Sequence, residues 1–261
     1  MAIFDAHEYS QFRVPYPQAV LSGLSSFCVP FCVQSKALNV VDLGGGTGLS
    51  AKSFLSVFPW AELTVVEPDS KMLEVARDTL KDFPKTRFAL NRAEDFPFEG
   101  PVDLVLAGSA WHWMNQDKIL KRLELVHVSA LFIFEYQFPK AKSSNALNDW
   151  IRREFNLKWR AAGQIPRGTL IELTQGLRDS NVFREVDRNS LLVERDFSAE
   201  AFYGMIVSQS RYLAFEKTLS DSEKIKGRQQ LRLELDSFFR SAGVFTFALF
   251  YESVLFRHRN V

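Results

Sequence analysis

One run constrains the fold of this 261-residue chain more than any other, namely residues 39–50, which read NVVDLGGGTGLS. An apolar segment ends in an acidic residue, breaks into glycines and resumes as a helix-forming sequence. This order predicts a buried strand, a tight turn and a helix. Glycines leave the backbone of such a turn free of Cβ atoms, so a ligand can approach closely at the carboxyl edge of a sheet.

Strand and helix patterns alternate after this run. Strands are expected at 37–43, 62–66, 86–90, 102–107 and 130–136, with helices at 48–58, 70–83 and 116–127. Alternation of this kind is typical of an α/β fold with a parallel, doubly wound sheet. Further strands at 182–193 and 245–256 predict a seven-stranded, mostly parallel, Rossmann-like sheet whose last strand is antiparallel. Helical stretches at 142–160, 199–215 and 220–239 predict a helical cap.

Composition narrows the classes of partner and site. Basic and acidic residues number 32 and 31, a formal net charge of +1, which leaves no electrostatic footprint for nucleic acid or an anionic membrane. We therefore expect a small-molecule partner. The chain shows neither a leader nor a membrane-spanning run, which favours the cytoplasm. Cys28 and Cys32 have no partners at zinc-like spacing, so we expect buried thiols and no metal.

Two acidic residues give the glycine turn its chemical character. Asp42 stands just before the turn, where a fixed carboxylate repels pyrophosphate and attracts a cationic, amine-bearing ligand. S-adenosylmethionine carries both an ammonium and a sulfonium, so the residues predict a methyl-donor site. Glu67 ends the second strand and can accept hydrogen bonds from both ribose hydroxyls, which by itself does not choose between nucleoside cofactors.

Two further segments reach the same edge of the expected sheet. The polar turn at 91–97 follows the third strand where the adenine edge would lie, and Ala93 is small enough for a flat ring. The fourth strand ends at Ala107 and leads into residues 108–113, GSAWHW, where the reacting methyl would emerge.

These motifs, in this order, resemble the class I S-adenosylmethionine-dependent methyltransferases. The nearest group is the type-11 small-molecule branch, which includes enzymes like trans-aconitate methyltransferase. The matching segments are Val40–Gly48, Glu67–Leu73, Ala93–Pro97 and Asp103–Val105 through His112 and Trp113, and Tyr9–Pro17 looks like the group's N-terminal signature. The resemblance covers roughly residues 4–136. The chain departs from the pattern at Gly45, where the family usually has Cys or another residue.

The resemblance implies a set of cofactor contacts. Gly44, Gly46 and Gly48 would approach the methionine moiety, and Glu67 the ribose. Pro68 and Met72 would lie on the adenine face, with Ala93 and Glu94 at its edge. Tyr9 and Arg13 would close over the methionine carboxylate, although Arg13 is equally consistent with a surface residue over Phe12 and Tyr16. The expected cofactor-binding residues are Tyr9, Arg13, Asp42, Gly44, Gly46, Gly48, Glu67, Pro68, Met72, Ala93, Glu94 and Ala107.

The expected organisation follows from this site. We predict an N-terminal helical lid at 1–36, an S-adenosylmethionine-binding core at 37–138 and a helical cap insertion at 139–181. Residues 182–261 complete the sheet and add cap helices.

Methyl transfer from a sulfonium is an in-line displacement in which alignment in a dry site matters most. A carboxylate acceptor needs no base, whereas a hydroxyl acceptor needs one. His112 is the candidate base, and Trp113 could shield the methyl or face the sulfur; structural roles remain open for both. A carboxylate acceptor could also pair with arginines of the cap, which are Arg152, Arg153, Arg160, Arg167 and Arg211.

Three other functions remain open. Residues 46–51 fit a glycine-x-glycine-x-x-alanine pattern, which would suit an NAD-dependent dehydrogenase, although Asp42 would face its pyrophosphate. The chain could also bind the cofactor without catalysis, as a partner module. A nucleic-acid methyltransferase is disfavoured because residues 107–110 lack the Asn/Asp-Pro-Pro-aromatic motif.

Overall fold

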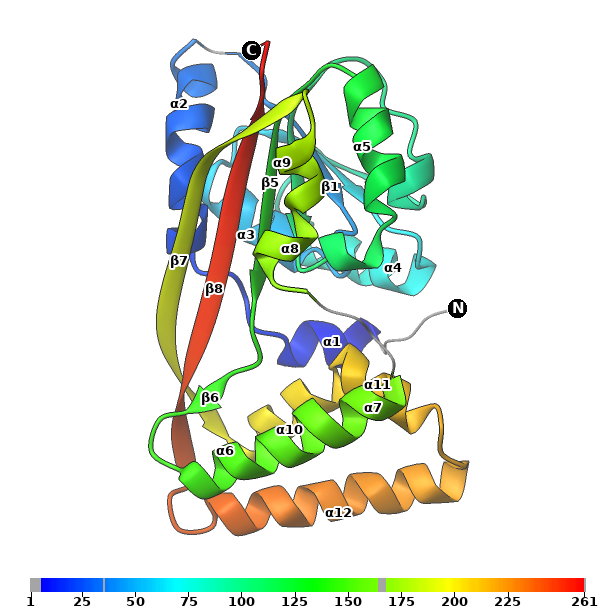
Figure 1. Cartoon of the computed structure of the whole chain (residues 1–261), viewed down its shortest axis with the longest axis vertical. Helices are drawn as coiled ribbons and strands as arrows, with labels where there is room; N and C mark the ends of the chain where they lie inside the picture. The colour runs from blue at the N-terminus through cyan, green and yellow to red at the C-terminus, as the bar shows by residue number, and fades with distance from the viewer. Residues whose placement is uncertain (1–5, 35, 164–167, 261) are drawn as a thin grey trace. The chain divides into compact units, whose positions relative to one another are not determined.

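The computed structural model describes residues 6–34, 36–163 and 168–260. The chain forms two compact units (Figure 1). The sheet unit consists of Pro15–Tyr136, Arg167–Leu191 and Tyr251–Val261, and the helical unit of Met1–Val14, Gln137–Pro166 and Leu192–Phe250. These units differ from the four segments expected from the sequence, because the long strands β7 (Phe183–Ser198) and β8 (Val244–His258) each contribute residues to both.

Five parallel strands form the centre of the sheet unit. They are β1 (Asn39–Leu43), β2 (Glu62–Val66), β3 (Thr86–Ala89), β4 (Val102–Gly108) and β5 (Val128–Tyr136), in the order β3-β2-β1-β4-β5. Strand β8 then pairs antiparallel with β5, from Ala130↔Arg257 to Tyr136↔Tyr251. Every residue of β5 is buried, as expected for a strand covered on both faces. The predicted mostly parallel sheet with an antiparallel closing strand is confirmed.

Helices of the sheet unit follow the strands as the alternation predicted. They are η1 (Gln18–Leu24), α2 (Ser25–Val33), α3 (Leu49–Val57), α4 (Ser70–Thr79), η2 (Ala93–Asp95), η3 (Trp111–Trp113), α5 (Gln116–Leu125), α8 (Leu170–Leu173) and α9 (Gln175–Asp179). Side chains cap the start of three of them, because Asp69 caps α4, Asn115 caps α5 and Thr169 caps α8. One core cluster joins Val105 and Leu131 of the sheet to Leu123 of α5. Helices α8 and α9, which also contribute to this core, were not expected from the sequence.

The helical unit contains α1 (Ala6–Phe12), α6 (Asn145–Ile151), η4 (Arg152–Lys158), α7 (Trp159–Gly163), α10 (Ala199–Val207), α11 (Ser210–Glu216) and α12 (Asp221–Phe239), with the two-residue strand β6 (Lys140–Ala141) paired to β8. Residues 199–215 break into two helices because Gln209 is extended and the Ser208 hydroxyl bonds back to the Met205 carbonyl oxygen at 2.9 Å. Within 142–160 the helix has a π-helical stretch, η4. Including β6, the sheet has eight strands in the part of the chain that the structure describes, rather than the seven predicted.

No helix among residues 6–34, 36–163 and 168–260 combines the length and apolar character that crossing a membrane requires.

Candidate functional site

The strand order fixes where a ligand site is expected in the sheet unit. The sheet grows from β1 toward β2 and β3 on one side and toward β4 and β5 on the other. Open α/β sheets bind ligands outside the carboxyl ends of their strands, at the point where the order reverses. Here that point lies between β1 and β4, so the loops after Leu43 and Gly108 form the candidate site.

The loop after β1 is a glycine turn with three residues in the left-handed region. Gly44, Gly46 and Gly48 have φ of 66°, 56° and 82°, which side chains rarely adopt. Gly44 and Gly45 both donate their amide N–H to the Val66 carbonyl oxygen, at 2.8 and 3.2 Å. The turn is therefore fastened to the end of β2 and passes directly into α3.

The glycines differ in what surrounds them. A Cβ at Gly44 would lie 2.7 Å from the Ala110 Cβ, and one at Gly48 would lie 3.1 Å from Leu80. At Gly45 it would meet Val65 at 2.7 Å, so the departure from the family pattern at this position coincides with a tightly packed site. Only Gly46, among these four, has no neighbour within 4 Å and so offers open backbone to a ligand.

Asp42 lies fully buried beneath the turn. Its Oδ2 accepts a hydrogen bond from the Ser50 hydroxyl at 2.6 Å, while its buried Oδ1 has no partner among the described residues. Burial raises the pKa of Asp42 to about 7, and the nearby charge of Glu67 adds to the rise. A buried carboxylate with one unused oxygen is suited to a cationic or hydrogen-bond-donating ligand.

Glu67 follows β2 and stabilises the glycine turn through a hydrogen bond with its backbone. Its Oε2 accepts from the Gly46 amide and its Oε1 from the Asp69 amide, both at 3.0 Å. Burial raises the pKa of Glu67 against the opposing effect of these two hydrogen bonds. Because a carboxylate oxygen has two lone pairs, each oxygen can still accept from a ribose hydroxyl.

The expected adenine contacts occupy neighbouring loops of the same edge. Pro68 is exposed before α4, whereas Met72 and Ala93 are buried. Glu94 accepts from the Asn115 amide at 2.7 Å and lies 3.6 Å from Arg92. Burial works to raise the pKa of Glu94, but these two interactions outweigh it, and the pKa is lowered. Glu94 thus joins the loop after β3 to the start of α5.

Ala107 lies in the core near the end of β4 and has no exposed surface. Ser109, two residues later, has φ of 49°, the one non-glycine positive value among the described residues. Its hydroxyl accepts from the Tyr16 hydroxyl at 2.7 Å, and its amide donates to the Phe134 carbonyl oxygen at 2.7 Å. Strain of this kind persists only where surrounding contacts enforce it.

The helix η3 carries the two catalytic candidates. His112 is half-buried, with its ring 5.1 Å from that of Trp113, whose exposed fraction is 42%. Trp111 is buried, and its indole N–H donates to the Leu173 carbonyl oxygen at 2.8 Å, which fixes η3 to the segment that contains α8. The site roles of His112 and Trp113 remain predictions.

Tyr9 and Arg13 belong to the helical unit. The Arg13 guanidinium carbon lies 4.4 Å from the Tyr9 ring centroid, and its Nη2 donates to the Ser208 carbonyl oxygen at 2.9 Å. Their predicted role over the cofactor is not tested by these contacts. Among the cap arginines, Arg211 contacts Asn156 at 2.9 Å, while Arg167 lies outside the described residues.

Sequence reasoning missed several residues that organise this edge. The Ser50 hydroxyl donates to Asp42 only eight residues away, but serine is too common a residue to mark this pairing; the Tyr16 hydroxyl donates to Ser109 across 93 residues, which no sequence motif shows. Thr47 is buried in the turn with an Oγ1 that has no hydrogen-bond partner in the described part of the chain. The position of Ser50 in the first turn after the glycines was the only available signal.

Comparisons with known proteins agree with this arrangement. Residues 40–128 match the family model of a methyltransferase domain. A malonyl-[acyl-carrier protein] O-methyltransferase of Ilyobacter polytropus is 26% identical over 80 residues, which are 31% of this chain and 30% of that protein. A Saccharomyces cerevisiae protein assigned as an S-adenosylmethionine-dependent methyltransferase is 26% identical over 129 residues, 47% of this chain and 42% of that protein.

The chain thus spans less than half the length of these curated relatives. A solved structure from Anaeromyxobacter dehalogenans, assigned as a type II methyltransferase, is similar with a TM-score of 0.66. The comparison covers 95% of this chain and 98% of that one at 17% sequence identity, and so concerns the fold alone.

Proposed function

Because residues 40–128 form a methyltransferase domain of the class I, S-adenosylmethionine-dependent type, we propose that this chain methylates a small molecule. The methyl group passes from S-adenosylmethionine to a carboxylate or hydroxyl oxygen of the acceptor. The observation that carries the proposal is the pair of carboxylates, Asp42 and Glu67, around the open backbone of Gly46.

The residues present fit this cofactor. Asp42 has an unused buried oxygen that suits the ammonium group, and Glu67 retains acceptor capacity for ribose hydroxyls. Gly46 leaves its backbone open, as close approach of the methionine part requires. When bound, S-adenosylmethionine supplies a methyl group on a positively charged sulfur, which an oxygen nucleophile displaces in line.

The work left to the protein is alignment and exclusion of water. Trp111 fixes η3 through its bond to Leu173, so the backbone that carries His112 and Trp113 has a defined position in the sheet unit. For a hydroxyl acceptor, His112 would take the proton; for a carboxylate acceptor, no base is needed. The Ilyobacter relative is named for O-methylation of a malonyl group, which supports a carboxylate acceptor.

The glycine turn argues against a dinucleotide. A pyrophosphate binds to free amide N–H groups at the turn and at the start of the helix. Here the amides of Gly44 and Gly45 donate to Val66, that of Gly46 to Glu67 and that of Gly48 to Gly45. These donors of the turn are already used, and the carboxylates of Asp42 and Glu67 next to the turn would repel a pyrophosphate. An NAD-dependent dehydrogenase is therefore disfavoured.

Titration calorimetry with S-adenosylhomocysteine and with NAD tests the cofactor. We expect binding of S-adenosylhomocysteine alone, weakened about tenfold or more by Glu67→Gln, because an amide is a weaker acceptor for ribose hydroxyls than a carboxylate. Glu62→Gln serves as the matched control, because Glu62 begins the strand that Glu67 follows, is partly exposed and has only Arg87 at 3.8 Å as an ionic partner. Binding of NAD in place of S-adenosylhomocysteine would contradict the proposal.

A second experiment separates catalysis from mere binding. Small carboxylic acids and alcohols are screened with methyl-labelled S-adenosylmethionine, and labelled ester or ether products are expected. If the donor binds but label never leaves it for any acceptor, the chain is a non-catalytic binding module. If label appears only on protein side chains, the small-molecule proposal is wrong.

A further inference from the structure

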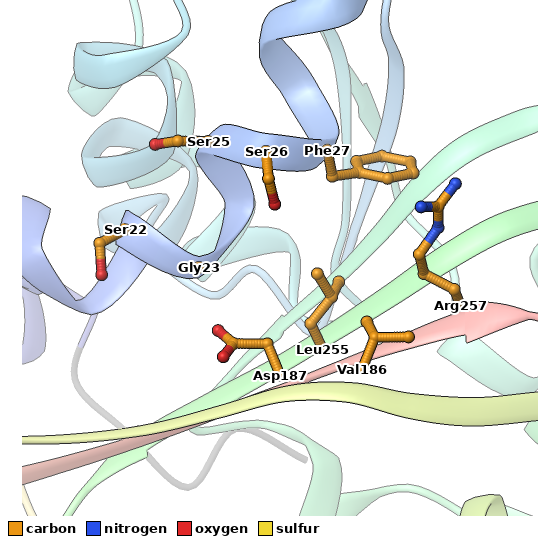
Figure 2. A pocket seen from close by; sticks show the side chains of 9 residues that line it. All are labelled: Ser22, Gly23, Ser25, Ser26, Phe27, Val186, Asp187, Leu255 and Arg257. Carbon is orange, nitrogen blue, oxygen red and sulfur yellow. The ribbon is translucent and has the colours of Figure 1, made fainter.

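A pocket lies in the sheet unit, between the η1–α2 segment and strands β7 and β8 (Figure 2). Its volume is about 480 Å³. It is lined by Ser22, Gly23, Ser25, Ser26, Phe27, Val186, Asp187, Leu255 and Arg257. None of these residues belongs to the glycine turn or to η3, so the methyltransferase site does not account for this pocket.

Arg257 is the cationic group of the pocket and forms no ion pair within residues 6–34, 36–163 and 168–260. The side chain is half-buried, and its guanidinium carbon lies 5.5 Å from the Phe27 ring centroid. Its Nε is buried without a hydrogen-bond partner, and no ion pair joins it to a carboxylate among the described residues. Such a group is costly to bury unless a partner arrives, and a guanidinium binds a carboxylate through two parallel hydrogen bonds.

Asp187 is the anionic group of the pocket and is similarly unmatched. It is half-buried, and in the described part of the chain it makes neither an ion pair nor a hydrogen bond. Its Oδ2 lies 2.1 Å from where a Cβ of Gly23 would stand, so only glycine permits the carboxylate to lie against this backbone. Glycine at position 23 therefore leaves space for the Asp187 carboxylate.

The two charges occupy different ends of the pocket. Figure 2 shows Asp187 beside Gly23 and Arg257 beside Phe27, with the side chains of Leu255 and Val186 between them. Serine hydroxyls line the η1–α2 side. A complementary ligand has one negative and one positive end joined by an apolar stretch.

We propose that this pocket binds a small zwitterion, with its carboxylate on Arg257 and its ammonium on Asp187. The aliphatic part of the ligand lies over Leu255 and Val186. This binding is independent of the methyltransferase proposal, because the residues of the two sites do not overlap.

A series of amino acids with increasing charge separation tests the proposal: glycine, β-alanine, γ-aminobutyrate, δ-aminovalerate and ε-aminocaproate. Binding to the full chain is followed by titration calorimetry and by protein NMR shifts. We expect affinity to pass through a maximum along the series, because the charges in the pocket have a fixed separation. Hexanoate and hexylamine, which each carry one of the two charges, should bind about tenfold more weakly than ε-aminocaproate.

Variants assign the two ends. Arg257→Gln and Asp187→Asn should each weaken the best zwitterion about tenfold, and Gly23→Ala should do the same by displacing Asp187. Arg259→Gln, on an exposed side chain of the same chain segment, is the matched control and should have no effect. Circular dichroism spectra and cooperative thermal unfolding like those of the parent would show an intact fold in each variant.

Three results would overturn the proposal. The first is absence of binding by the whole series at millimolar concentration, with the fold intact. The second is equal binding of hexanoate with no effect of Asp187→Asn, which would describe a simple anion site. The third is loss of zwitterion binding on adding S-adenosylhomocysteine in direct competition, which would place the zwitterion in the methyltransferase site.

Discussion

Replacing Asp42 with Asn should stabilise the ligand-free protein in a pH-dependent way. Burial raises the pKa of this carboxyl from 3.8 to about 7. In the unfolded chain the group ionises near pH 4, so between that pH and 7 the folded state holds the proton more tightly. Folding stability therefore falls as the pH rises through this window, by at most about 4 kcal/mol for a rise of this size.

In the parent, the Ser50 hydroxyl donates to Asp42 at 2.6 Å. An Asn side chain does not ionise, but its amide oxygen can still accept this hydrogen bond. The difference in unfolding free energy between Asp42→Asn and the parent should grow from pH 4 to pH 7 and then level off. Urea denaturation across this range measures it, with Asp82→Asn, at an exposed position, as control. A difference that does not change with pH would refute the reasoning.

The same variant links stability to the proposed function. Because the ionised carboxylate is the form that attracts an ammonium group, Asp42→Asn or Asp42→Ala should weaken S-adenosylhomocysteine binding about tenfold or more without unfolding the chain. Unchanged affinity would show that Asp42 does not contact the cofactor.

Three further outcomes are expected. The affinity of the parent for S-adenosylhomocysteine should fall as the pH drops below about 7, and titration calorimetry should show that Asp42→Asn removes this dependence. Gly46→Ala should mainly weaken S-adenosylhomocysteine binding. Gly45→Ala should instead mainly lower the melting temperature of the protein, since its Cβ would meet Val65 at 2.7 Å. The same pattern of effects in both variants would contradict this. Trp111→Phe should cost about 1 kcal/mol and speed hydrogen exchange in residues 168–179, because it removes the donor to the part-buried Leu173 carbonyl oxygen, while Trp113→Phe should do neither.

Most strands and helices of the sheet unit could be predicted from sequence because their signals are local. The strand at 62–66 and the helix starting at Ser70 coincide with β2 and α4, where an apolar run meets an Asp69 cap. The helix α9 was not predicted because it has five residues and is held by tertiary contacts such as Arg178 with Glu185. The four-residue helix α8 does carry a local signal, the capping box of Thr169 and Glu172, but its apolar run is too short to stand out. The break at Ser208 likewise depends on one side-chain hydrogen bond.

By itself, the sequence determined the parallel sheet, the glycine turn and the two acids, Asp42 and Glu67, that point to a methyl donor. These follow from residue order, because a strand, a turn and a helix are read from neighbouring residues. Only the tertiary structure decided that Gly46, among the four glycines of the turn, offers open backbone, that the Ser50 hydroxyl donates to Asp42, and that Arg257 and Asp187 line the same pocket. Each of these features depends on burial and on distances between side chains, which exist only once the chain has folded.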